Sequence, residues 1–194
     1  TARSVDLVRD AKAEGLNVTA EVTPHHLSLT QELLTTFDPV YKVNPPLRSM
    51  KDIQALKVGL LDGTIDAVAT DHAPHARRDK ELTLDQAPPG MIGLETALGV
   101  VLSCVDLDPV QIAAVMSRNP ARIAQITEQH GHNIGVGDIA HLCVVDLNAM
   151  WQVDPSKMAS KSRNTPFVGR QLRGMVRSTM YRGQITVLDG VAQK

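Results

Sequence analysis

The first two thirds of the chain alternate between two hydrophobic patterns. Val5 and Val8 recur at helical spacing within residues 4–14, and this spacing predicts a helix. Gly15 predicts the end of that helix, and the apolar run at 17–22 predicts a buried strand. An alternation of helices and strands is typical of a parallel sheet that is covered by helices.

Two further units of the same kind follow. Thr30 is expected to cap a short helix, and residues 41–44 predict a brief strand that two prolines end. Ser49 and Asp52 have the spacing of a capping box. The helix that this box begins is followed by a third predicted strand at 65–70.

A long polar stretch follows the third predicted strand. Residues 71–89 are too many for a simple connection, so we expect a binding loop there. The mixed charge run at 77–81 within it is expected to be a solvated face. Helical patterns then resume, with Asp108 as a predicted cap, at 94–105, 109–117 and 120–126.

The pattern changes at about residue 129 to short alternating strands. Such strands, separated by turn residues, indicate a small β-rich module. We therefore expect two domains, at 1–128 and 129–194. The predicted strands of the second domain, with a tight turn at Arg182 and Gly183, are 141–145, 151–153, 174–181 and 184–188.

Composition and charge narrow the class of ligand. The chain has 43% hydrophobic residues, 20 basic against 21 acidic side chains, one Trp, two Tyr and two Phe. It therefore has neither a basic stripe nor a stacking platform for nucleic acid, and a small-molecule ligand is expected. Because no apolar run is long enough to cross a bilayer, we expect a cytoplasmic protein without a membrane partner. Cys104 and Cys143 are expected to be free thiols.

Polar residues follow each predicted strand. They are Glu21 with the segment 23–26, then Asn44, then the segment 71–75. The carboxyl ends of parallel strands are where active sites are built in α/β folds. Asp71 leaves an apolar strand, and a partly desolvated carboxylate suits a metal ligand or a general base.

Several of these residues also have purely structural interpretations. His25 and His26 are expected to be a structural pair, because neighbours on an extended chain point in opposite directions. Asn44 alone is also typical of a turn that ends a strand. Gly90 would allow a ligand to approach the backbone closely, although a single glycine is weak evidence.

Four segments occur in the order and spacing of one enzyme family. They are EVTPHHL at 21–27, VNPPLR at 43–48, ATDHAPH at 69–75 and PGMIGLET at 89–96. Together they resemble the bacterial dihydroorotases of the amidohydrolase superfamily. The resemblance extends over almost the whole chain, and residues 134–146 resemble the strand that enters the small β-domain of that superfamily.

The resemblance implies an α/β fold: the last three units of an amidohydrolase (β/α)8 barrel and part of a small composite β-sandwich domain. It implies a zinc-dependent hydrolase that interconverts dihydroorotate and N-carbamoyl-L-aspartate in pyrimidine biosynthesis. By motif position, Asp71 matches a zinc ligand that also transfers the proton. Asn44 and His75 match side chains that hold the substrate, and Pro89 and Gly90 match backbone contacts to its ring.

The resemblance also implies that the other ligands of one or two Zn²⁺ ions lie upstream of this chain. Because a catalytic zinc needs several protein ligands, the 194 residues alone are expected to be an inactive carboxyl-terminal portion. Two alternatives stay open. One is another cyclic-amide hydrolase, an allantoinase or hydantoinase. The other is a non-catalytic dihydroorotase-like subunit of aspartate carbamoyltransferase. A homodimer and this transferase are the protein partners considered.

Overall fold

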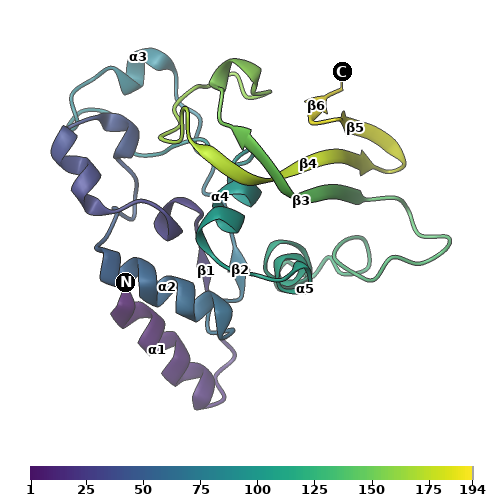
Figure 1. The fold of residues 1–194 in the computed structure, drawn as a ribbon. Coiled ribbons are helices and arrows are strands. Elements are labelled where there is room, and N and C mark those ends of the chain that lie inside the picture. Colours follow the sequence, from purple (N-terminus) through teal and green to yellow (C-terminus); the bar gives the residue numbers. More distant parts are fainter. Residues whose placement is uncertain (194) are drawn as a thin grey trace.

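Two short parallel strands form the centre of the α/β part. A computed structural model describes residues 1–193. In it β1 (Glu21–Val22) pairs with β2 (Ala67–Val68), and Val22 lies opposite Val68. Figure 1 shows the two strands side by side, with α3 beyond one end of the pair and the tip of α1 beyond the other. Because the strands are parallel, both carboxyl ends lie at the same edge.

The second predicted strand, at 41–44, does not form. Residues 41–44 follow the 3-10 turn Pro39–Tyr41, and the N–H of Lys42 donates to the carbonyl oxygen of Pro39 at 3.0 Å. That amide closes the turn and is not available to a neighbouring strand. The two prolines that follow have no N–H to donate either. The prediction of a strand at 41–44 is therefore wrong.

The first two helices are joined at their amino-terminal ends. Ser49 and Asp52 form the predicted capping box at the start of α2 (Met50–Leu61). The Asp52 carboxylate also accepts a hydrogen bond from the N–H of Ala2, at 2.8 Å, in the first turn of α1 (Ala2–Ala13). One carboxylate thus satisfies free N–H groups of both helices.

Several short helices lie between β2 and the second sheet. Asp108 caps the helix that follows it, as predicted. Its carboxylate accepts hydrogen bonds from two N–H groups of the first turn of that helix. A π-helical turn at Ala114–Arg118 then precedes Pro120, which has no N–H to continue a regular helix. The helices of this region are α3 (Arg77–Lys80), α4 (Ala97–Cys104), α5 (Pro109–Ala113) and α6 (Asn119–Ile123).

The carboxyl-terminal residues form a four-stranded antiparallel sheet. Its order is β3-β4-β5-β6, and it forms a separate layer beside the helices in Figure 1. A register shift between Asp146 and Met150 lets one long strand replace the two predicted at 141–145 and 151–153. The strands are β3 (Leu142–Gln152), β4 (Gln171–Tyr181), β5 (Gln184–Leu188) and β6 (Val191–Ala192).

The two parts of the molecule share a hydrophobic core. One cluster packs Val100 of α4 against Leu172 of β4, together with Leu29, Val153 and Phe167. The N–H of the Trp151 indole donates to the carbonyl oxygen of Gly174 at 2.8 Å at the edge of this contact. The small sheet is therefore anchored on α4 and on the loops near the strand ends.

Two further expectations concern the cysteines and membrane-spanning helices. Cys104 and Cys143 are both free thiols, as predicted. Within residues 1–193, no helix has the length and apolar character needed to cross a membrane.

His25 is a buried histidine in the 3-10 turn His25–Leu27 that follows β1. The residue is 2% exposed, and its Nε2 atom has no hydrogen-bond partner among residues 1–193. Burial lowers the pKa of His25 to about 3, and the neighbouring His26 contributes to the same shift. The folded state therefore favours the neutral ring.

This burial predicts acid sensitivity of the folded state. The pKa of His25 is about 3 when folded and 6.5 as the ordinary value, so the unfolded chain binds the extra proton between these values. Stability due to this group is thus complete above the upper value and falls as the pH decreases toward the lower one. We expect His25→Leu to flatten the acid limb of the thermal unfolding temperature plotted against pH. Equal slopes in the wild-type protein and in His25→Leu would contradict the prediction.

Candidate active site at the strand ends

His26 joins two of the polar segments that follow predicted strands. One is the segment 23–26, and the other is the loop that contains Asn44 and Pro45, here called the Asn44 loop. The Nε2 atom of His26 lies 3.0 Å from the carbonyl oxygen of Pro45, and its Nδ1 atom lies 2.6 Å from Oγ1 of Thr23. Because a carbonyl oxygen only accepts, the hydrogen must be on Nε2, and Nδ1 accepts from the threonine hydroxyl. The expected structural role of this histidine is confirmed: it holds the segment after β1 against the Asn44 loop.

Asp71 lies at the carboxyl end of the β2 segment, close to that histidine. Its side chain is exposed, and its backbone has a φ of +48°, in the left-handed region. Asp adopts that region more readily than most residues. Burial lowers the pKa of His26, whereas the carbonyl groups of Pro45 and Pro46 and the charge of Asp71 raise it. The Asp71 carboxylate is therefore near enough to His26 for its charge to act on that ring.

The next two histidines bind the chain that returns toward α4. Nδ1 of His72 accepts hydrogen bonds from the N–H groups of Gly93 and Leu94, at 3.1 and 3.3 Å. Nε2 of His75 donates to the carbonyl oxygen of Pro89 at 3.0 Å. The structure thus brings His75, Pro89 and Gly90 together, as expected for parts of one site.

The two segments approach each other closely at Gly90. It has a φ of +132°, and a Cβ atom there would lie 2.5 Å from Cβ of Ala73 and 2.9 Å from Nε2 of His75. No side chain fits at these separations unless the backbone moves. The glycine is therefore required by the packing of the two loops.

Two side chains that hold this region were missed by the sequence analysis. The Nζ atom of Lys80 donates to the carbonyl oxygens of Pro88 and Gly90, both at 3.0 Å. The side chain of Asn164 reaches the same region from the segment between β3 and β4. Lys80 is partly buried, so the expectation that the whole charge run 77–81 is a solvated face is wrong for this residue. The charges of this run did not indicate that backbone carbonyl groups lie near Lys80.

The described residues do not complete a metal centre by themselves. Asp71 has a carboxylate suited to one ligand position of zinc. No group of three His, Cys, Asp or Glu side chains within residues 1–193 is placed to hold a metal ion. A zinc ion at Asp71 would thus need ligands beyond those that this part of the chain provides.

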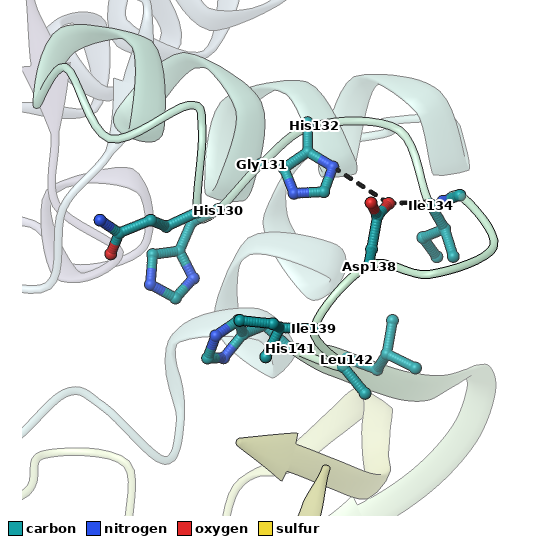
Figure 2. Close-up of a pocket in the computed structure, with 11 residues that line it drawn as sticks. His130, Gly131, His132, Ile134, Asp138, Ile139, His141 and Leu142 are labelled. Atoms are coloured by element: carbon teal, nitrogen blue, oxygen red, sulfur yellow. Dashed lines mark hydrogen bonds and ion pairs between the residues drawn. The ribbon is translucent and has the colours of Figure 1, made fainter. Parts of the chain in front are cut away.

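A second group of histidines lies away from the strand ends. His130, His132 and His141 line a cavity of about 180 Å³ before β3. Figure 2 shows His132 facing Asp138, and the separation of their Nδ1 and Oδ2 atoms is 3.7 Å. None of the predicted site residues lines this cavity, so it is separate from the candidate active site.

The close approach at Gly90 predicts a selective loss of stability. Gly90→Ala should lower the free energy of unfolding by about 1–3 kcal/mol more than Gly137→Ala, because overpacking forces the loops apart. Gly137 is a matched control, since it also has a positive φ, +101°, but a Cβ atom there would have nothing within 4 Å. Chemical denaturation of both variants measures the difference, and equal losses would show that backbone strain alone accounts for the effect.

The chain is similar in sequence to curated dihydroorotases. One from Streptomyces coelicolor is 54% identical over 98% of this chain and 45% of its own length. One from Mycobacterium tuberculosis is 47% identical over 97% of this chain and 45% of its own length. The chain therefore spans less than half of these relatives. The sequence-based resemblance to dihydroorotases is confirmed.

Solved structures and a family model agree on the fold. The L-hydantoinase from Arthrobacter aurescens matches with a TM-score of 0.89 at 31% identity, over 100% of this chain and 44% of that structure. The inactive dihydroorotase-like domain of the Chaetomium thermophilum CAD-like multifunctional protein matches with a TM-score of 0.72 at 22% identity, over 100% of this chain and 50% of that structure, and shows a shared fold. The expected partial α/β fold is confirmed. The model of the amidohydrolase family matches residues 7–186, and the chain belongs to that family.

Proposed function

We propose that this chain is the carboxyl-terminal part of a dihydroorotase, which interconverts dihydroorotate and N-carbamoyl-L-aspartate. The observation that carries the proposal is the contact between Nε2 of His75 and the carbonyl oxygen of Pro89, in the segment that Asp71 begins after β2. The similarity to curated dihydroorotases at 54% identity supports this choice of substrate. Pyrimidine biosynthesis is the corresponding metabolic role.

In this proposal Asp71 is the acid and base of the reaction. In the hydrolytic direction, water adds to the ring amide carbon, the carbon–nitrogen bond breaks, and the ring nitrogen gains a proton. A carboxylate near the scissile bond takes the proton from the water and gives it to the departing nitrogen. In the direction of ring closure the same carboxylate returns the proton. The exposure of Asp71 at the strand end leaves it accessible to a substrate.

The substrate is held by the loops around that carboxylate. Asn44 and His75 are proposed to bind the substrate carboxylate and polar atoms, and the backbone at Pro89 and Gly90 to bind the pyrimidine ring. The Pro89 carbonyl accepts the hydrogen of His75 Nε2 at 3.0 Å. Through its other nitrogen, the ring then donates to a substrate carboxylate only as the imidazolium cation.

We propose that the complete enzyme depends on one or two Zn²⁺ ions, with Asp71 as one ligand. Bound zinc would polarise the amide carbonyl and lower the pKa of a water molecule. Members of the amidohydrolase family supply a precedent for the metal. The remaining ligands would come from outside these 194 residues.

The domain division and the partners are further parts of the proposal. We assign residues 1–128 to the barrel and the remainder to the small β-domain, which is supported by the change from parallel to antiparallel pairing. A homodimer and a complex with aspartate carbamoyltransferase are the proposed assemblies, in a cytoplasmic enzyme.

A hydantoinase is the second candidate, because the L-hydantoinase of Arthrobacter aurescens matches at 31% identity. The dihydroorotase of Streptomyces coelicolor matches at 54% identity. Sequence similarity therefore favours dihydroorotate over hydantoin as the substrate. Asn44, with the loop around it, and His75 are the positions at which we expect a dihydroorotase site to differ from a hydantoinase site.

Asp71→Asn tests the proposed acid and base. Asn tolerates the left-handed conformation, so the fold should persist, while loss of the carboxylate should lower kcat for dihydroorotate hydrolysis by about 10²–10⁴-fold. Asp189→Asn is the matched control, because Asp189 is exposed and has nearly the same φ, +49° against +48°. In the full-length protein, activity retained by Asp71→Asn would remove Asp71 from the reaction.

The 194-residue chain by itself should not hydrolyse dihydroorotate, even with added zinc. A single carboxylate cannot hold a catalytic zinc ion that needs several protein ligands. Ring opening is measured as the loss of dihydroorotate absorbance, and the full-length protein is the positive control. A normal rate from the isolated chain would show that its own residues complete the site.

A further inference from the structure

The connection between β3 and β4 returns to the strand-end loops. The Glu95 carboxylate accepts hydrogen bonds from the N–H groups of Ala159 and Ser160, at 2.8 and 3.1 Å. A few residues later, the N–H of Ile92 donates to the carbonyl oxygen of Asn164 at 3.0 Å. This connection is therefore attached at several points to the chain segment that begins at Pro89.

The side chain of Asn164 joins the two loops of the candidate site. Its Nδ2 atom donates to the carbonyl oxygens of Ala73 and Gly90, at 2.9 and 3.2 Å. Its Oδ1 atom accepts a hydrogen bond from the N–H of His75 at 3.3 Å. Asn164 is 8% exposed, so these backbone groups have little access to water that could replace it.

Lys80 adds further contacts to the same backbone segment. The carbonyl oxygen of Gly90 accepts from both Asn164 and Lys80, and Lys80 also bonds to the carbonyl oxygen of Pro88. The N–H of Gly90 donates to the carbonyl oxygen of Lys42 at 2.8 Å. Both polar groups of the Gly90 peptide backbone are therefore held, and the loop has a fixed position relative to His75.

We propose that Asn164 is a positioning residue for substrate binding, with Lys80 as its partner. The inference rests on the proposed function, in which the backbone at 89–90 binds the substrate ring and His75 binds its carboxylate. Asn164 fixes the distance between these two groups, because it bonds to the chain on both sides at once. It thereby makes the small β-domain contribute to substrate affinity without contact with the substrate.

Asn164→Asp is the direct test in the full-length protein. The substitution keeps the size of the side chain and replaces both N–H donors by an oxygen that faces two carbonyl oxygens. We expect KM for dihydroorotate to rise at least about tenfold, with kcat reduced less than about threefold, because unpaired buried groups displace the loop. Asn148→Asp is the matched control, since Asn148 is exposed on β3, and it should leave KM unchanged.

A second pair of variants acts on the loop without changing the buried asparagine. Lys80→Met removes the ammonium group and should also raise KM, whereas Lys80→Arg restores hydrogen-bond donors and should restore part of the affinity. If Asn164→Asp does not fold, these two Lys80 variants test the positioning role instead. Far-UV circular dichroism and thermal unfolding establish that the variants being compared are folded.

The outcomes separate this inference from the proposed function. An active wild-type protein whose folded Asn164→Asp and Lys80→Met variants keep the wild-type KM overturns the positioning role alone. A fall in kcat without a change in KM also overturns it, because the loop would then not control substrate binding. A wild-type protein that does not turn over dihydroorotate overturns the proposed function, and this inference with it.

Discussion

The parallel pairing of β1 and β2 is the constraint on which the candidate site depends. With Val22 opposite Val68, the segments that leave the two strands emerge at one edge, and their polar residues come within reach of each other. His26 then bonds to the Asn44 loop, and the charge of Asp71 acts on His26. A shift of this register by one residue would reverse which side chains face the core. The site is therefore a consequence of how two short strands pair.

The loops at that edge are held by the main chain as much as by side chains. Gly90 approaches Ala73 and His75 so closely that a Cβ atom has no room. Its carbonyl group is bound by Lys80 and by Asn164, which comes from the far end of the chain. The small antiparallel sheet thus does more than cover α4: the connection between its first two strands reaches the candidate site. This arrangement joins the two parts of the molecule through polar contacts as well as through the shared core of Val100 and Leu172.

Local patterns in the sequence predicted the features that depend on neighbouring residues. The capping box at Ser49, the cap at Asp108 and the turn at Arg182 and Gly183 involve residues within a few positions of each other, and the structure has all three. The strand predicted at 41–44 does not form, because the N–H of Lys42 closes a 3-10 turn instead of pairing with a neighbouring strand. The roles of Lys80 and Asn164 were not predictable by local pattern, because their partners are backbone carbonyl groups. For Asn164 these groups lie 91 and 74 positions away in sequence. The resemblance in motifs identified the candidate site residues. The backbone carbonyl groups that Lys80 and Asn164 bind are not marked by any sequence motif.

Substrate preference distinguishes a dihydroorotase from a hydantoinase built on the same strand-end loops. The measurement is the ratio of kcat/KM values of the full-length protein for dihydroorotate and for hydantoin, together with ring closure of N-carbamoyl-L-aspartate. We expect turnover of dihydroorotate in both directions and a kcat/KM for hydantoin lower by orders of magnitude. Preferred hydrolysis of hydantoin, or no ring closure of N-carbamoyl-L-aspartate, would contradict this expectation.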